Sequence, residues 1–318
     1  MIFRVRGPFR VLGLISHKRA GEGFQALRAS ALNYCVNQVR RYDYKNYLCL
    51  LQLPRSGGLR DAAFALRAFN VETATAKDTA RDPSLATLRL AWWKDSIDKL
   101  FSRAAATPEH PVLSMLDHVN RERRLSKHWF SRIIDARVAD AELSAPPRDV
   151  GEIERYAEST ASALLYLTLE AAGVRSTKAD HAASHTGKAA GISLLLEATA
   201  HHSAKRVCYI PVEVAVKHGV SQEDLYRGVR GDEGVARAVF EVASVAHAHL
   251  EKARALAKDV PREASPVMLP AVATDEFLAT LMRSGFDPFD PRLRRGVCGV
   301  SPLWMLLKLK WHSLRGSY

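Results

Sequence analysis

Two aspartates, Asp78 and Asp82, are the first residues whose type and spacing suggest chemistry. They lie four positions apart in AFNVETATAKDTARDP, residues 68–83. On one continuous helix this spacing places two carboxylates on the same face, where they can share a magnesium ion. However, Pro83 follows Asp82 directly, and proline favours the first position of a helix that an aspartate caps. We therefore expect Asp82 to cap a new helix and a turn to separate it from Asp78.

The histidines and cysteines give weaker signals. His181 and His185 are four residues apart and can share a helix face, but Ala182 stands where the motif H-E-x-x-H has its glutamate. Partly buried or capping histidines are the simpler interpretation. The four cysteines form no C-x-x-C pair. We assign no metal ligand from the sequence.

The periodicity of the chain predicts an all-α protein. Apolar residues recur every three to five positions, and charged residues occupy the opposite faces. Prolines and glycines divide this pattern into roughly ten helices without a long linker, so we expect residues 29–318 to form a single domain. The longest apolar runs, residues 162–169 and 191–196, are far shorter than the ~20 residues that a membrane-spanning helix needs.

Positive charge is concentrated at the N-terminus. The formal net charge of the chain is +12, and residues 1–28 contain six basic residues but only one acid, Glu22. Apolar residues alternate with these cations, which is typical of a mitochondrial transit peptide. The alternative is a basic arm that stays on the mature protein. Elsewhere the cations form no dense blocks, so we expect no nucleic-acid partner.

Three segments resemble the squalene and phytoene synthases. AFALRAFNVETATAKD, residues 63–78, is similar to the first signature region of that family, and residues 187–211 are similar to the second. Residues 156–173 resemble the helix between them. The resemblance implies an isoprenoid-synthase-like helical bundle around a central apolar cavity. In such enzymes, magnesium ions held by carboxylates on facing helices bind the substrate diphosphates.

Both acidic clusters are incomplete in this sequence. When the sequence is aligned with the family's motif, the first cluster falls on residues 74–78. Its first position is occupied by Ala74, and only its last position, Asp78, is an acid. The second falls on Glu197, Ala198 and His202, of which only Glu197 is an acid. These five positions are interpreted as vestiges of the motifs, and we assign no catalytic residue. The alternative is a prenyl-diphosphate transferase with an altered magnesium site that uses Asp78, Glu197 and Glu72.

A subset of this family with degenerate metal motifs offers a further resemblance. DYKNYLCLLQLP, YAESTASALLYLTLE and HGVSQEDL resemble the assembly factors of mitochondrial respiratory complex I. This implies a non-catalytic protein that acts early in building the membrane arm of complex I. Its partners would be complex I subunits or other assembly factors, and it would bind peripherally to the matrix side of the inner membrane. We expect no cofactor, unless a lipid, quinone or isoprenoid occupies the cavity.

A basic group follows the second signature region. His201, His202, Lys205 and Arg206 lie within six residues of one another. His201, Lys205 and Arg206 could contact a phosphate or a lipid headgroup at the cavity mouth. The alternative is an ordinary solvated turn.

The C-terminal segment, residues 301–318, combines aromatic residues with cations. Trp304 and Trp311 alternate with Lys308 and Lys310, a pattern that suits the interface between a membrane and water. The alternative is a final helix that closes the bundle, with its tryptophans packed inward.

Overall fold

Helices make up nearly all of the regular structure. The computed structural model describes residues 9–79, 82–102 and 108–318, and in these ranges one isolated bridge, between Val297 and Val300, is the only β pairing. The helices are α1 (Phe9–Tyr42), α2 (Tyr44–Leu50), α3 (Leu59–Asp78), α4 (Pro83–Ser102), α5 (Pro111–Arg123), α6 (Lys127–Glu142), α7 (Val150–Ala157), α8 (Ala163–Ala171), α9 (Thr177–Glu197), α10 (Thr199–Ala204), α11 (Val212–Lys217), α12 (Gln222–Arg227), α13 (Glu233–Ala255), α14 (Pro270–Arg283) and α15 (Pro302–Arg315). A π-helical turn, η2 (Glu158–Ser162), joins α7 to α8. The all-α prediction is confirmed.

The number of helices exceeds the roughly ten that the sequence predicts. The additional helices are short, since α10, α11 and α12 each contain six residues. Periodicity is recognised only over windows of about 11 residues or more, so helices of this length give no detectable pattern.

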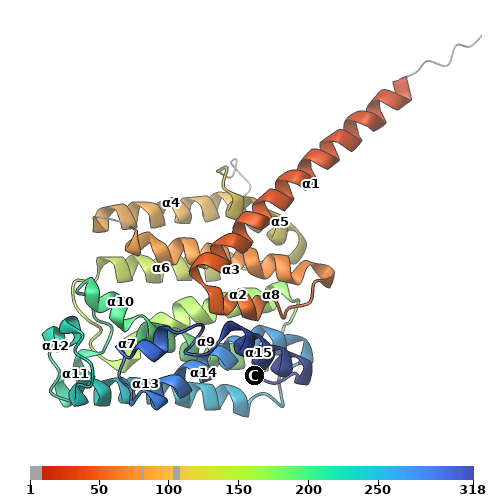
Figure 1. Ribbon diagram of the computed structural model, residues 1–318. Coiled ribbons are helices and arrows are strands. Elements are labelled where there is room, and N and C mark those ends of the chain that lie inside the picture. Colours follow the sequence, from red (N-terminus) through yellow and green to blue (C-terminus); the bar gives the residue numbers. More distant parts are fainter. Residues whose placement is uncertain (1–8, 80–81, 103–107) are drawn as a thin grey trace, which may run out of the picture.

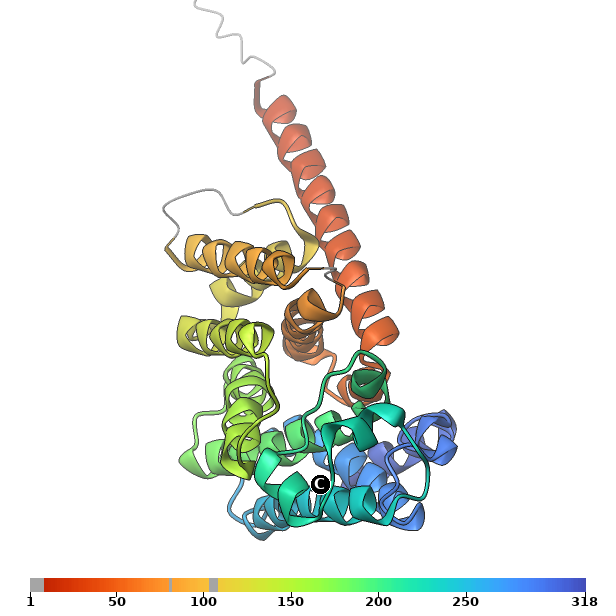
Figure 2. The same cartoon turned by 90° about the vertical axis from the view of Figure 1, so that its left-hand side faces the viewer.

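The helices are arranged in two layers. In Figure 1, α3, α4, α5 and α6 lie above α7, α9, α13 and α14. The end of α1 packs against the upper layer through Ala31, Cys35 and Val39, while its beginning projects away from the body (Figures 1 and 2). The predicted boundary between a transit peptide and the domain, after residue 28, falls within α1. That peptide stays a prediction, and its residues 1–8 lie outside the described residues.

Each layer has its own hydrophobic core. The upper core contains Phe69, Trp93 and Phe130, which meet edge to face at centroid distances of 5.5 and 5.1 Å. The lower core lies between α9, α13 and α14. Tyr47 and Trp129 pack against both cores, so the two layers are joined by apolar contacts as well as by the chain.

The helix α3 runs through the upper layer with nearly all of its sides covered. Gly57 and Gly58 precede it with φ angles of +70° and +72°, a backbone conformation that favours glycine and turns the chain out of α2. The helix ends at Asp78. The Oδ1 atom of Asp82 accepts a hydrogen bond from the Ser84 backbone N–H at 2.9 Å, at the start of α4. The predicted cap is therefore confirmed, and Asp78 and Asp82 do not share a helix.

No helix in the described ranges combines the length and the apolar composition that crossing a bilayer requires. The exposed apolar residues are instead distributed over the surfaces of individual helices, most densely on α15.

Candidate functional site

A cavity of about 360 Å³ lies between α3 and α9. Residues of α2, α4, α6, α7, α10 and the π-helical turn η2 also line it. The wall is mixed: Leu90, Leu194 and Leu195 contribute apolar surface, whereas five lysine and arginine side chains contribute positive charge. A volume of this size is in the range of small-molecule binding sites.

The motif positions predicted from the sequence converge on this cavity. Ala74 and Asp78 of α3 line it opposite Ala198 and His202. Glu197 forms an ion pair with Lys45, which also lines the wall. The fold therefore brings the two degenerate signature regions face to face, as the resemblance implies.

The acid at the mouth of the cavity has cationic partners within the chain. The Lys205 ammonium lies 2.9 Å from the Oδ1 atom of Asp78, and the Nε2 atom of His201 lies 3.4 Å from it. Burial alone would raise the pKa of Asp78, but the hydrogen bonds and charges of Lys205 and His201 outweigh burial and lower it. Asp78 is therefore an ionised carboxylate that is already neutralised by side chains.

The second acid is neutralised in the same way. Burial would lower the pKa of Lys45, but the nearby Glu197 carboxylate outweighs burial and raises it. Lys45 therefore stays charged. Its ammonium group occupies the Glu197 carboxylate, which a synthase motif would present to a metal.

A third acid, Asp140 of α6, was not identified from the sequence. It is buried, and it accepts hydrogen bonds from Lys77 at 3.1 Å and from the Tyr209 hydroxyl at 2.7 Å. Burial and then the neighbouring Asp140 raise the pKa of Tyr209, so this hydroxyl stays protonated and acts as a donor. A single aspartate in an amphipathic helix carries no local sequence signal that would distinguish it from a solvated residue.

Arg137 is the cation of the cavity wall without an acidic partner. It hydrogen-bonds the Tyr156 hydroxyl, lies 3.5 Å from the Asn70 side-chain oxygen, and stacks 5.3 Å from the Tyr156 ring centre. Its Nε atom is buried without a hydrogen-bond partner. In the part of the chain that the structure describes, no carboxylate lies within ion-pair distance of its guanidinium. The arrangement suits an anion better than a cation.

His202 contributes a neutral polar group to the same cavity wall. Its ring packs 4.7 Å from that of Tyr209, and its Nδ1 atom is buried without a hydrogen-bond partner. Burial lowers the pKa of His202 to about 4, so the ring is neutral at pH 7.

The donor set does not fit the magnesium ions that the family's enzymes use. Among the described residues, no three histidine, cysteine or acidic side chains are grouped so that they could hold a metal ion. Magnesium prefers several oxygen ligands, and here alanine occupies positions 74 and 198 while lysines hold Asp78 and Glu197. We derive no chemical step through magnesium.

The remaining predicted residues lie away from the cavity wall. Arg206 points to Glu223 at 2.9 Å on α12. On α15, Trp304, Lys310 and Trp311 are exposed, whereas Lys308 pairs with Glu276 at 2.8 Å. The membrane role of Trp304, Lys308, Lys310 and Trp311 stays a prediction. The headgroup role of His201, Lys205 and Arg206 also stays a prediction.

His181 and His185 do not act together. The Nδ1 atom of His185 instead lies 2.8 Å from that of His249, whose other nitrogen contacts Glu154. Burial, followed by His249, lowers the pKa of His185 to about 4. This chain of groups is a hydrogen-bonded contact between α7, α9 and α13.

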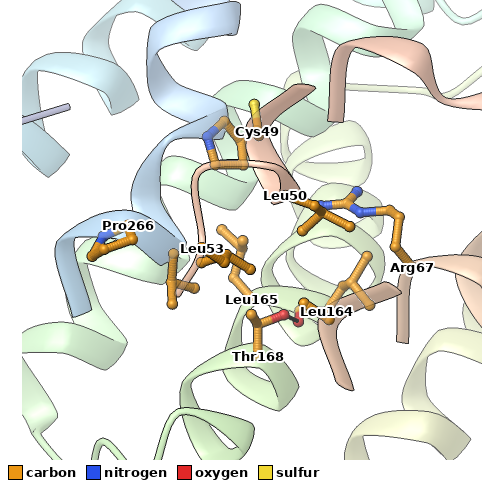
Figure 3. A pocket seen from close by; sticks show the side chains of 11 residues that line it. Cys49, Leu50, Leu53, Arg67, Leu164, Leu165, Thr168 and Pro266 are labelled. Carbon is orange, nitrogen blue, oxygen red and sulfur yellow. Dashed lines mark hydrogen bonds between the residues drawn. The ribbon is translucent and has the colours of Figure 1, made fainter. Parts of the chain in front are cut away.

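A second hollow is far smaller. Figure 3 shows it between Leu50, Leu53, Leu164 and Leu165, with Arg67 at one side. Its volume of about 10 Å³ holds one water molecule at most. It is a packing defect between the two layers and adds nothing to the site.

The fold and the facing signature regions define a protein with the isoprenoid-synthase-like helical architecture. A solved structure of a dehydrosqualene synthase in complex with ligand superposes with a TM-score of 0.77 at 16% identity, covering 92% of this chain and 99% of that chain. A model of the squalene/phytoene synthase family matches residues 39–298. The chain belongs to this family.

Relatives with higher sequence identity are named for a role in assembly rather than for synthase activity. A protein from Bos taurus named NADH dehydrogenase (ubiquinone) complex I, assembly factor 6, is 41% identical over 276 residues, which is 87% of this chain and 80% of the relative. Its homolog from Drosophila melanogaster is 44% identical over 261 residues, covering 80% of this chain and 76% of the relative.

Proposed function

We propose that this protein is a non-catalytic assembly factor of mitochondrial respiratory complex I, built on a synthase scaffold that has lost its metal site. It acts early in the biogenesis of the membrane arm, on complex I subunits or on other assembly factors. Its location is the matrix side of the inner membrane, where it binds peripherally. The names of relatives that are 41% and 44% identical over most of the chain support the assembly role.

One observation carries the non-catalytic part of the proposal. The two facing helix segments that hold the diphosphate chemistry in the family contain Ala74, Ala198 and His202 at acid positions, and the remaining acids, Asp78 and Glu197, are bound by lysines. Diphosphate departure needs several metal-bridging carboxylates, because the leaving group carries a large negative charge. This cavity offers cations of the protein instead.

The proposal is tested with cells that lack the protein. Complex I abundance on native gels should fall in these cells and return on re-expression, and membrane-arm intermediates should be depleted. In parallel, the purified protein with magnesium and a C15 or C20 prenyl diphosphate should release no diphosphate above a no-protein control. Unchanged complex I would contradict the assembly role, whereas diphosphate release would contradict its non-catalytic basis.

A second candidate function is the binding of an amphiphile with an anionic head in the cavity. The observation that favours it is Arg137, whose guanidinium has neutral partners and a buried Nε atom without a hydrogen bond. Leucine side chains of the wall would contact an apolar tail. Such binding is compatible with an assembly role, since neither requires turnover.

This second function is tested by native mass spectrometry of gently purified protein. We expect a bound anionic lipid or isoprenoid whose occupancy falls about fivefold or more in Arg137→Met, as expected when a charge-assisted hydrogen bond is lost. Arg132→Met is the matched control, because Arg132 lies on the same helix and outside the cavity wall. An empty cavity in the wild type, or equal loss in both variants, would reject this function.

A further inference from the structure

The helix α15 presents an exposed apolar stripe. The stripe consists of five side chains that are 55% to 66% exposed: Leu303, Trp304, Leu307, Trp311 and Leu314. At about 100° per residue they cover one side of the helix. The opposite side is anchored in the lower core by Met305 and Leu309, which are fully buried. The tryptophans therefore do not close the bundle.

Cations border this stripe on both sides. Lys310 lies at one edge of the stripe and Arg315 at the other, where its guanidinium stacks 4.4 Å from the Trp311 ring centre. Arg294 and Arg295 are exposed eight and seven residues before the start of α15. Among the described residues, none of these four cations has a carboxylate within ion-pair distance.

The segment that contains the stripe carries charge of one sign. Residues 291–318 contain six lysines and arginines and no acid. Two acids of α14, Asp275 and Glu276, are engaged by Lys308 of this segment at 3.5 and 2.8 Å. A protein partner whose surface carries both positive and negative charge would not require this excess of cations. An anionic bilayer does match it, because indole rings occupy the headgroup level while lysine and arginine ends reach lipid phosphates.

We propose that the exposed face of α15, together with Arg294 and Arg295, is the surface by which this protein docks on an anionic lipid bilayer. The helix lies parallel to the bilayer, its leucines and tryptophans enter the interface, and the four cations contact headgroups. The inference rests on the proposed peripheral location at the inner membrane, but not on the assembly role.

The test is flotation of the full-length protein with vesicles of phosphatidylcholine alone or with added cardiolipin. Binding should require cardiolipin and should weaken at high salt. Trp304→Ser/Trp311→Ser should reduce binding about tenfold or more, because both indoles lose their apolar contact. Lys310→Glu/Arg315→Glu should reduce it by at least roughly 25-fold, because the two lost cations alone account for about that factor and the new carboxylates are repelled by an anionic surface.

Matched controls lie on α4, far from α15 in both views (Figures 1 and 2). Leu85→Ser/Leu88→Ser removes two exposed apolar side chains. Lys94→Glu/Lys99→Glu makes the same change of formal charge, although these lysines pair with Asp135 and Asp95. Both should bind like the wild type, and all variants should keep its melting temperature.

Three results would overturn the proposal. The first is binding that is insensitive to cardiolipin and salt, and the second is an equal loss of vesicle binding in the α4 and α15 variants. The third is a wild-type dimer that the tryptophan substitutions dissociate, which would make the face a contact between copies of this chain. If vesicle binding is as expected but complex I is unaffected by loss of the protein, the docking surface stands and the assembly role fails.

Discussion

At the scale of single residues, the ion pair between Lys45 and Glu197 shows how a motif position has changed its role. The side chains are only 18% and 27% exposed. We expect Glu197→Gln to lower the free energy of unfolding by about 2–3 kcal/mol, because it leaves a buried ammonium without its partner. Urea denaturation measures the change.

The control for this prediction removes both charges together. Lys45→Met/Glu197→Leu should recover at least half of the lost stability, because no unpaired charge remains. A single variant within about 0.5 kcal/mol of the wild type would show that water already screens the pair.

His202 predicts a dependence of stability on pH. Burial lowers the pKa of His202 to about 4. The carboxylates of Asp78 and Asp140 oppose this shift, whereas the charges of His201 and Lys77 add to it. Between pH 6.5 and 4 the unfolded chain binds a proton at this residue and the folded chain does not. Stability is therefore complete above pH 6.5 and is lost on acidification by up to ~1.4 kcal/mol per pH unit.

The measurement compares urea unfolding at pH 7 and pH 5. The wild type should lose ~2 kcal/mol more than His202→Gln over this interval, since the glutamine cannot titrate. Equal losses in the two proteins would mean that His202 titrates alike in the folded and unfolded chains.

Sequence reasoning located the motif residues but not their partners. Asp78, Glu197 and His202 were identified because they fall in two segments with a recognisable pattern. Lys45 and Asp140 lie about 150 and 60 residues away from the groups that they pair with, so only the tertiary fold brings them together. Arg137 was missed for the same reason.

At the scale of elements, the close packing of α9 on η2 shapes one wall of the cavity. A Cβ atom at Gly187 would lie 2.3–2.5 Å from atoms of Ser162, including its backbone. We expect Gly187→Ala to destabilise the protein by about 2–3 kcal/mol, because backbone cannot move aside as a flexible side chain can. Thermal or urea unfolding measures this.

Gly151→Ala on α7 is the matched helical control. Its new methyl group would meet the mobile end of Arg155 at 3.0 Å and the carboxylate of Asp149 at 3.1 Å. We expect the free energy of unfolding to change by less than about 1 kcal/mol, because the lower entropy of the unfolded chain offsets the strain of these contacts. Similar losses at both positions would refute the close approach of α9 and η2.

Long helices were predictable and short ones were not. The breaks at Asp82 and Pro83 and at Gly57 and Gly58 were read from residue types whose backbone preferences are strong. The short helices α10 to α12 depend on tertiary contacts rather than on a periodic pattern.

At the scale of the whole molecule, the fold of the squalene/phytoene synthase family is retained, while the acids that remain at its motif positions form ion pairs with lysines. The all-α architecture follows from the periodicity, and the family follows from two signature regions that the fold places face to face. The mixed polarity of the cavity wall could not be predicted, because it depends on which sides of α3, α6 and α9 meet.

We propose that this fold supports the assembly of complex I without the residual acids of the motifs. The decisive measurement is complex I abundance on native gels from cells that lack the protein and express Asp78→Asn/Lys45→Met/Glu197→Leu. This variant removes both acids without stranding the buried lysine. At equal protein levels, we predict rescue equal to that of the wild type; no rescue by a folded variant would contradict the claim and assign the cavity acids a direct role.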